Sequence, residues 1–314
     1  MKYFKLLIFM ALLHSVAVSQ DCRFVVTCDM REYSGAGFFD TSDYFRGTCE
    51  AIARVGKGDF MISPGDIDPP ADVYYTISTY LGADYLWYPC IGNHESETPA
   101  DMDWLETFCT GLTNVINWGP ASCPLTTYSF EWGKIHFAVI NEYCDEFSNT
   151  GADGDVTDTI YDWLRADLER NTKPLVFVIG HEPAYPKHDV DCGRIRNVRA
   201  SLDRNPANRD RFWQLLKEFG VLAYLCGHSH GYSAVEIDGV WQIDAGHCRG
   251  AGDTGAPSTF VTIEVKGQTV EMMAFRDTHD GQYDYFDVVH TEYLARDWEA
   301  PAAPTGVRVV GRDE

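Results

Sequence analysis

Five short motifs, each at the end of an apolar run, carry the residue types that could do chemistry in this chain. They offer carboxylates, one carboxamide and several imidazoles, which are the ligands of hydrolytic centres that hold two divalent metal ions. In chain order the motifs are Thr27-Cys28-Asp29, Gly65-Asp66, Gly92-Asn93-His94-Glu95, Gly180-His181-Glu182 and Gly227-His228-Ser229-His230. Any one of them alone could be a turn or a helix cap, but five in order predict a metal centre.

The apolar runs that precede the motifs are continuous rather than alternating, which is typical of strands buried on both faces. Strands are expected over residues 23–28, 59–63, 86–91, 175–179 and 221–226. The spacing of apolar residues predicts helices over 43–55, 157–171 and 209–219. Alternating strands and helices indicate an α/β fold, in which the carboxyl ends of the strands would bring the motifs to one crevice.

Hairpins interrupt this alternation. Strand-like runs flank Gly133-Lys134, Asp238-Gly239 and Lys266-Gly267-Gln268, and Asp-Gly is a strong signal for a two-residue turn. We therefore expect two mixed β-sheets packed face to face and flanked by helices, a four-layer αββα sandwich.

The first 19 residues have the features of a secretory signal peptide. Lys2 and Lys5 accompany an apolar stretch that is too short to cross a bilayer, and Ala17-Val18-Ser19 offers small residues for cleavage. No later segment is apolar enough to be transmembrane. We expect one domain over residues 20–300, and a linker or the start of a further C-terminal module over 301–314, where Pro and Ala are frequent.

Export to the periplasm or outside the cell also bears on the ten cysteines. An even number in an exported chain favours some disulfides, although their connectivity cannot be read from the sequence. The formal net charge is −22, and such an acidic surface repels nucleic-acid backbones, so bulk nucleic-acid binding is not expected. A small phosphorylated substrate stays compatible, because bound metal cations would dominate the field locally. The oligomeric state is left open.

The ordered motifs resemble those of the calcineurin-like metallophosphoesterase superfamily, which includes purple acid phosphatases, phosphodiesterases and protein phosphatases. The resemblance spans about Phe24 to Thr262. It implies two divalent metal ions, with Mn, Fe and Zn all suited to the mixed ligands. By resemblance, the first metal position takes Asp29, Asp66 and His230, and the second takes Asp66, Asn93, His181 and His228. Asp66 would bridge the two ions and so belongs to the catalytic machinery as well.

Three further residues have roles that the resemblance implies or raises. His94 is expected to face the substrate, where it would stabilise charge or protonate the leaving oxygen. Arg31 stands where the family usually has a histidine, two residues after the first aspartate. Either the first position binds its metal more weakly, or Arg31 binds the substrate phosphate as a bidentate donor. His247 is a candidate substrate contact, whereas His136 lies in an alternating strand and is interpreted as structural.

Two functions are compatible with these motifs. The first is an exported phosphoesterase that hydrolyses phosphate mono- or diesters with a metal-activated hydroxide and no phosphoenzyme. The second is a metal- or phosphate-ligand-binding module of the same fold whose hydrolytic power is impaired, with Arg31 as the mark of that loss. The sequence favours the enzyme, because a decayed site has no reason to keep His94.

Overall fold

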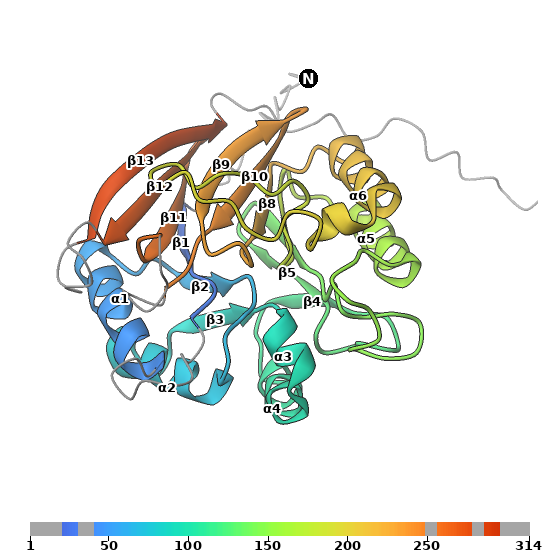
Figure 1. Cartoon of the computed structure of the whole chain (residues 1–314), viewed down its shortest axis with the longest axis horizontal. Helices are drawn as coiled ribbons and strands as arrows, with labels where there is room; N and C mark the ends of the chain where they lie inside the picture. The colour runs from blue at the N-terminus through green and yellow to red at the C-terminus, as the bar shows by residue number, and fades with distance from the viewer. Residues whose placement is uncertain (1–20, 31–40, 249–255, 278–285, 296–314) are drawn as a thin grey trace, which may run out of the picture.

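Two β-sheets pack face to face in the computed structural model, and helices cover their outer faces (Figure 1). The structure describes residues 21–30, 41–248, 256–277 and 286–295. This architecture confirms the sandwich that the sequence predicts. The expected signal peptide and the segment 301–314 lie outside the described residues. Within the described part, no helix combines the length and the apolar character needed to span a bilayer.

The first sheet contains six of the described strands in the order β13-β12-β11-β1-β2-β3. Its parallel strands are β1 (Cys22–Val26), β2 (Phe60–Ser63) and β3 (Leu86–Pro89). Its antiparallel strands are β11 (Thr259–Lys266), β12 (Thr269–Asp277) and β13 (Phe286–Ala295). Because β11 pairs with β1, segments from opposite ends of the chain share this sheet.

The second sheet contains seven of the described strands in the order β4-β5-β6-β7-β8-β10-β9. They are β4 (Val115–Trp118), β5 (Tyr128–Trp132), β6 (Ile135–Val139), β7 (Leu175–Ile179), β8 (Ala223–Cys226), β9 (Tyr232–Ile237) and β10 (Val240–Ala245). The strands β6, β7, β8 and β10 run parallel, while β5–β6 and β9–β10 form antiparallel pairs. The three hairpins expected from turn residues are therefore confirmed, including β11–β12 in the first sheet.

Helices α1 (Thr41–Val55) and α2 (Pro70–Leu81) lie beside the first sheet, and α5 (Asp158–Arg170) and α6 (Pro206–Glu218) lie beside the second (Figure 1). The short α3 (Asn93–Glu97) and α4 (Pro99–Cys109) follow β3, and a 3-10 turn, η1, spans Leu202–Arg204. The predicted helices correspond to α1, α5 and α6. Helices α2 and α4 were not predicted, although each begins with proline in its first turn, where the missing N–H costs nothing.

Aromatic side chains hold the two sheets together. Phe24 on β1 stacks on Phe60 of β2 with ring centroids 5.3 Å apart, and it meets Phe137 of β6 edge-on at 5.2 Å. All three side chains are completely buried. Such pairs stabilise a core beyond the area that they bury. The ends of strands from both sheets are thus kept in a fixed relation.

A disulfide joins Cys123 to Cys144, which confirms the expectation that some cysteines pair. The other eight cysteines, all of which the structure describes, are free, and only Cys192 among them is exposed. Cys28 and Cys226, at strand ends, are buried thiols as expected.

Candidate metal centre

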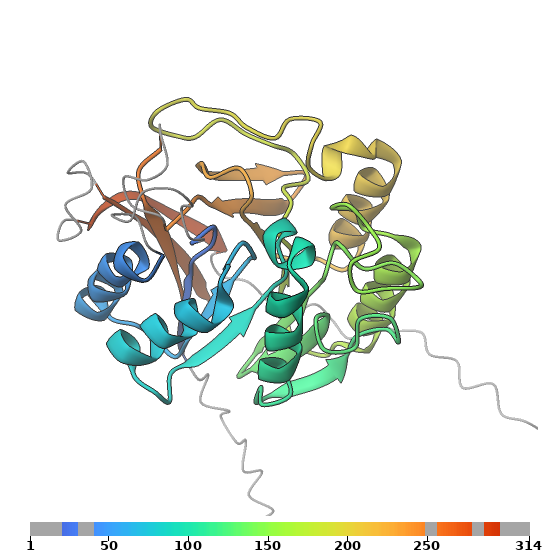
Figure 2. The ribbon, with the colours of Figure 1, turned by 60° about the horizontal axis from the view of Figure 1, so that its bottom comes forward.

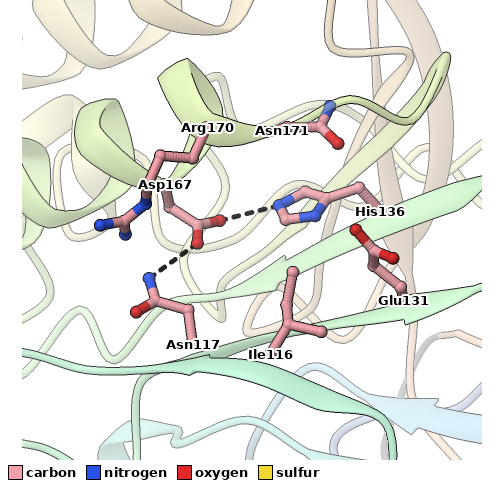
Figure 3. Close-up of a pocket in the computed structure, with 7 residues that line it drawn as sticks. All are labelled: Ile116, Asn117, Glu131, His136, Asp167, Arg170 and Asn171. Atoms are coloured by element: carbon pink, nitrogen blue, oxygen red, sulfur yellow. Dashed lines mark hydrogen bonds and ion pairs between the residues drawn. The ribbon is translucent and has the colours of Figure 1, made fainter.

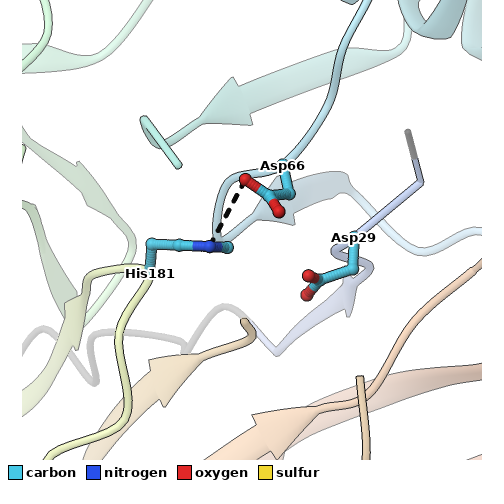
Figure 4. A group of neighbouring side chains, drawn as sticks. All are labelled: Asp29, Asp66 and His181. Carbon is cyan, nitrogen blue, oxygen red and sulfur yellow. Dashed lines mark ion pairs between the residues drawn. The ribbon is translucent and has the colours of Figure 1, made fainter. Parts of the chain in front are cut away.

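The five motifs meet where strands of the two sheets end. Asp29 and Asp66 follow β1 and β2, and Asn93 follows β3 at the start of α3; His181 follows β7, while His228 and His230 follow β8. Figure 4 shows side chains from both sheets turned toward one point. Ligand atoms of Asp29, Asp66 and His181 all lie within 4.8 Å of one another. The structure therefore brings together the six residues proposed as metal ligands; that they bind metal stays a prediction.

Four of these residues adopt a left-handed backbone conformation, which is uncommon for residues other than glycine. The φ angles are 52° at Asp29, 53° at Asp66, 66° at His228 and 55° at His230. Each such residue costs about 1–3 kcal/mol and persists where the surrounding structure holds it, most often at functional sites. The backbone strain thus collects at the residues that carry the predicted chemistry.

Two motif glycines leave the room that the aspartates need. A Cβ at Gly92 would lie 2.4 Å from Oδ1 of Asp66, and a Cβ at Gly227 would lie 2.4 Å from Oδ2 of Asp29. Both separations are far shorter than any real contact, so a side chain at either position would displace a carboxylate. The glycines of the motifs are therefore explained by the close approach of backbone to the two aspartates.

Four ligand atoms of the predicted second position are linked by short separations. Nδ1 of His228 lies 3.2 Å from Nε2 of His181 and 3.2 Å from Oδ1 of Asn93, and Nε2 of His181 lies 3.4 Å from Oδ1 of Asp66. Nδ1 of His181 donates to the carbonyl of Pro64 at 2.7 Å, so Nε2 presents its lone pair. These separations suit neighbouring ligands of an ion with bonds of about 2.0–2.2 Å, so the second position fits a divalent metal.

The carboxylate of Glu182 faces the outer side of one of these imidazoles. Its Oε2 lies 3.2 Å from Nε2 of His228, and its Oε1 accepts a hydrogen bond from the hydroxyl of Tyr143 at 2.7 Å. Metal-binding histidines commonly present their other nitrogen to such a carboxylate, which orients the ring. Glu182 was not predicted to have a role, although it directly follows His181 in the chain.

The first predicted position is less complete. Asp29 is fully buried, and its Oδ2 accepts from the backbone N–H of His228 at 2.9 Å, which leaves Oδ1 for another partner. Nε2 of His230 lies 3.2 Å from that oxygen, but Nη1 of Arg196 lies 2.7 Å from Nδ1 of the same ring. Arginine can only donate, so the ring proton is placed on Nε2, and His230 in this arrangement does not offer the expected lone pair.

Burial governs the ionisation of the centre. It raises the pKa of Asp66, and the neighbouring charge of Asp29 adds to this shift. It lowers the pKa of His228 to about 4, with a further contribution from His181, whose own pKa burial also lowers. Burial acts to raise the pKa of Asp29, yet the imidazole of His230 holds this pKa below its usual value. His181 and His228 are therefore neutral near pH 7, the form in which imidazole binds metal.

Two buried glutamates outside the predicted set hold the loops of the centre. Glu95 accepts hydrogen bonds from the backbone N–H groups of Asp66, Ile67 and Gly92, at 3.0, 2.7 and 2.7 Å. It thereby joins the loop after β2 to the loop after β3. The sequence contained a signal for it, since it is the last residue of the third motif.

Glu142 holds the loop after β7 in the same way, by accepting hydrogen bonds from its backbone. It accepts from the backbone N–H groups of His181 and Glu182 at 2.8 and 2.7 Å, and from the hydroxyl of Tyr224 at 2.6 Å. Glu142 follows the end of β6 as the motif residues follow their strands, and that position could have drawn attention to it.

The residues expected to contact substrate are less completely described. The His94 side chain is 23% exposed, and its Nε2 lies 3.7 Å from Oδ2 of Asp66. His247 is buried, with Nε2 2.8 Å from the carbonyl of Ala256 and its ring 6.0 Å from that of His230. Arg31 lies outside the described residues. The substrate roles of all three stay predictions.

His136 belongs to a different cluster, away from the strand ends. Its Nε2 lies 2.7 Å from Oδ2 of Asp167, whose other oxygen accepts from Asn117 at 2.7 Å and from Ser129 at 2.8 Å. Figure 3 shows His136, Asp167 and Asn117 around a pocket between α5 and the strands beside it. The buried aspartate is thus satisfied by three donors, which agrees with the structural interpretation of His136.

Comparisons with known proteins give one family match and several distant relatives. A model of the family described as Calcineurin-like phosphoesterase matches residues 22–232. Purple acid phosphatase 22 of Arabidopsis thaliana is 24% identical over 210 residues, which covers 59% of this chain and 41% of the relative. Purple acid phosphatase 23 of the same plant is 25% identical over 144 residues, which covers 45% of this chain and 27% of the relative. The chain thus spans less than half the length of these relatives.

Two solved structures share the fold. GAP50, described as the anchor in the inner membrane complex of Plasmodium, is 14% identical with a TM-score of 0.54, and the match covers 89% of this chain and 90% of that one. PhoD is 12% identical with a TM-score of 0.53, and the match covers 86% and 72%. At such identities the likeness concerns the fold alone.

Proposed function

The chain belongs to the calcineurin-like phosphoesterase family, and from this premise we propose that it hydrolyses phosphate mono- or diesters with divalent metal ions at two neighbouring positions. One observation carries the proposal: ligand atoms of Asp66, Asn93, His181 and His228, from four separate loops, each lie 3.2–3.4 Å from a neighbour in the set. Separations of this size are those expected between neighbouring ligands of one divalent ion.

Divalent ions bound there would supply positive charge for the phosphoryl oxygens and lower the pKa of water toward neutrality. The chain supplies the remaining functions. Asp66 lies 3.4 Å from Nε2 of His181 and belongs to the same cluster as Asp29, so it would contribute to both positions. The partly exposed His94 is the candidate acid, and it would give a proton from its ring to the departing alcohol oxygen. Arg31 would bind a phosphate oxygen, and His247 would stay close to the substrate beside His230.

We also propose that the protein is exported, with a signal peptide over residues 1–19 and a domain over 20–300 that a linker or further module follows. The disulfide between Cys123 and Cys144 supports this, because disulfides persist in oxidising compartments. Mass spectrometry of the protein secreted by its host would identify the mature N-terminus; a chain that keeps residues 1–19 would contradict the proposal.

The alternative function is a metal- or phosphate-ligand-binding module of the same fold without hydrolytic power. The first metal position favours this alternative, because Arg31 replaces an expected ligand there and Arg196 contacts His230. The two functions make different predictions for catalysis, although both predict metal binding.

Assays of the full chain with p-nitrophenyl phosphate and bis-p-nitrophenyl phosphate, with added Mn²⁺ or Zn²⁺, separate the two functions. We expect hydrolysis that Asp66→Ala abolishes and that His94→Ala lowers. Asp162→Ala and His188→Ala are matched controls, because both residues are exposed and stand outside the motifs; they should retain full activity. No hydrolysis with either metal would support the binding module instead.

A further inference from the structure

The three imidazoles of the centre differ in what faces their outer nitrogen. Behind His181 stands the carbonyl of Pro64, and behind His228 stands the carboxylate of Glu182. Pro64 accepts from Nδ1 of His181 at 2.7 Å, which leaves Nε2 of that ring with its lone pair, and the oxygen of Glu182 at 3.2 Å favours a ring proton on Nε2 of His228. These two rings are therefore arranged to receive a metal ion without rearrangement.

The third ring has the opposite arrangement. Nη1 of Arg196 lies 2.7 Å from Nδ1 of His230, and a guanidinium has no acceptor, so Nδ1 must accept. The ring proton is then on Nε2, which lies 3.2 Å from Oδ1 of Asp29. A metal ion can bind Nε2 only if the proton moves to Nδ1 and Arg196 withdraws. The positive charge of Arg196 opposes a second cation as well.

Arg196 is held at this point by the loop that carries it. Figure 2 shows the long loop between β7 and α6 arching over β9 and β10. Next to Arg196, the amide of Asn197 donates to the carbonyl of His228 at 2.7 Å. Farther back, the loop carries Asp189, whose carboxylate binds the buried Arg276 of β12 at 2.6 Å. The contact between Arg196 and His230 is thus part of an anchored structure.

We propose that the two metal positions load unequally: the position formed by Asp66, Asn93, His181 and His228 binds its ion first, and Arg196 competes with the second ion for His230. The inference rests on the proposed function for the identity of the ligand, a divalent cation. Its content goes beyond the proposed function, because it depends on a loop arginine that none of the five motifs contains.

Calorimetric titration of the metal-free full chain with Mn²⁺ tests the order of loading. We expect a tight first ion and a second ion bound at least about tenfold more weakly, since the second must break a charge-assisted hydrogen bond. Arg196→Leu should strengthen the second step by about tenfold and leave the first unchanged. Arg196→Lys keeps a charged donor and should resemble the wild type. Arg199→Leu removes the same charge from an exposed position of the loop and is the matched control.

Two ligand variants assign the steps. His181→Ala should remove the tight step, whereas His230→Ala should remove only the weak one, and thermal melting of each variant verifies that it is folded. Two equally tight ions in the wild type, or no effect of Arg196→Leu on the second step, would overturn the inference. No substrate is present, so this result is separate from hydrolysis: unequal loading without any esterase activity would refute the proposed function alone.

Discussion

Oε2 of Glu182 lies 3.2 Å from Nε2 of His228, on the side of the ring that faces away from the other ligands. The glutamate is itself buried and fixed, because its second oxygen accepts from the hydroxyl of Tyr143. A carboxylate in this place favours a ring proton on Nε2, while Nδ1 is directed toward His181 and Asn93. The direction of one candidate ligand thus depends on a residue that is not a ligand.

Removal of this carboxylate should weaken metal binding without removing any ligand. We expect Glu182→Ala to lower the affinity for Mn²⁺ about 10- to 100-fold, as is usual for partners of metal-bound histidine. Glu182→Gln should recover part of the loss, because its amide oxygen can still accept. Competition with a chelator measures the affinity, and Glu169→Ala, an exposed change on α5, is the control. Equal affinities in all four proteins would show that Glu182 has no such role.

His94 should act on the leaving group and not on the metal. We expect His94→Asn to lower kcat for an alkyl phosphate about 10²- to 10⁴-fold, the usual contribution of a general acid. The loss should be smaller for p-nitrophenyl phosphate, because p-nitrophenolate departs without much help. Metal content, measured by elemental analysis, should not change. Equal losses for both substrates would exclude proton donation by His94.

The sequence allowed the strands and the candidate ligands to be predicted for the same reason. Continuous apolar runs such as 175–179 define buried strands, and polar residues placed after them must gather at one edge of a sheet. Helix α2 was not predicted, because Tyr and Thr, which favour strands, stand between its buried Val73, Ile77 and Leu81. Arg196 could not be predicted, since it lies in a loop without periodicity, and the bond that anchors that loop joins Asp189 to Arg276, 87 residues away.

That anchoring pair should matter for stability. The Arg276 side chain is completely buried, so Asp189→Asn leaves a charge without its main partner, and we expect a loss of about 3 kcal/mol in the free energy of unfolding. Denaturation in urea measures it. Asp210→Asn, which breaks an exposed pair with Arg209, should change stability by less than about 0.5 kcal/mol.

The same pair has a predictable dependence on pH. Burial acts to raise the pKa of Asp189, but the hydrogen bonds from Arg276 hold it below its usual value in the folded protein. A carboxylate with a depressed pKa stabilises the folded protein at any pH above its pKa in the unfolded chain, which is about 4. This contribution is lost as the pH falls further. The difference between wild type and Asp189→Asn should therefore shrink in acid; a difference that grows in acid would contradict the assigned role.

Glu142 should make stability depend on pH in the opposite direction. Burial raises its pKa to about 7, although the Tyr224 hydroxyl and two backbone N–H groups act against this shift. The folded state thus binds the proton more tightly than the unfolded state, whose pKa is about 4.5. Stability is then fully present below pH 4.5 and falls as the pH rises to 7, by about 3 kcal/mol in total.

Glu142→Gln removes this ionisation and keeps the hydrogen bonds, because the amide oxygen can face the two N–H groups while the amide nitrogen donates to Tyr224. We therefore expect the metal-free variant to gain stability relative to the wild type as the pH rises from 4.5 to 8. Urea denaturation across this range gives the difference curve, with the exposed Glu146→Gln as control. A difference that does not vary with pH would mean that Glu142 ionises in the folded protein as it does in the unfolded chain.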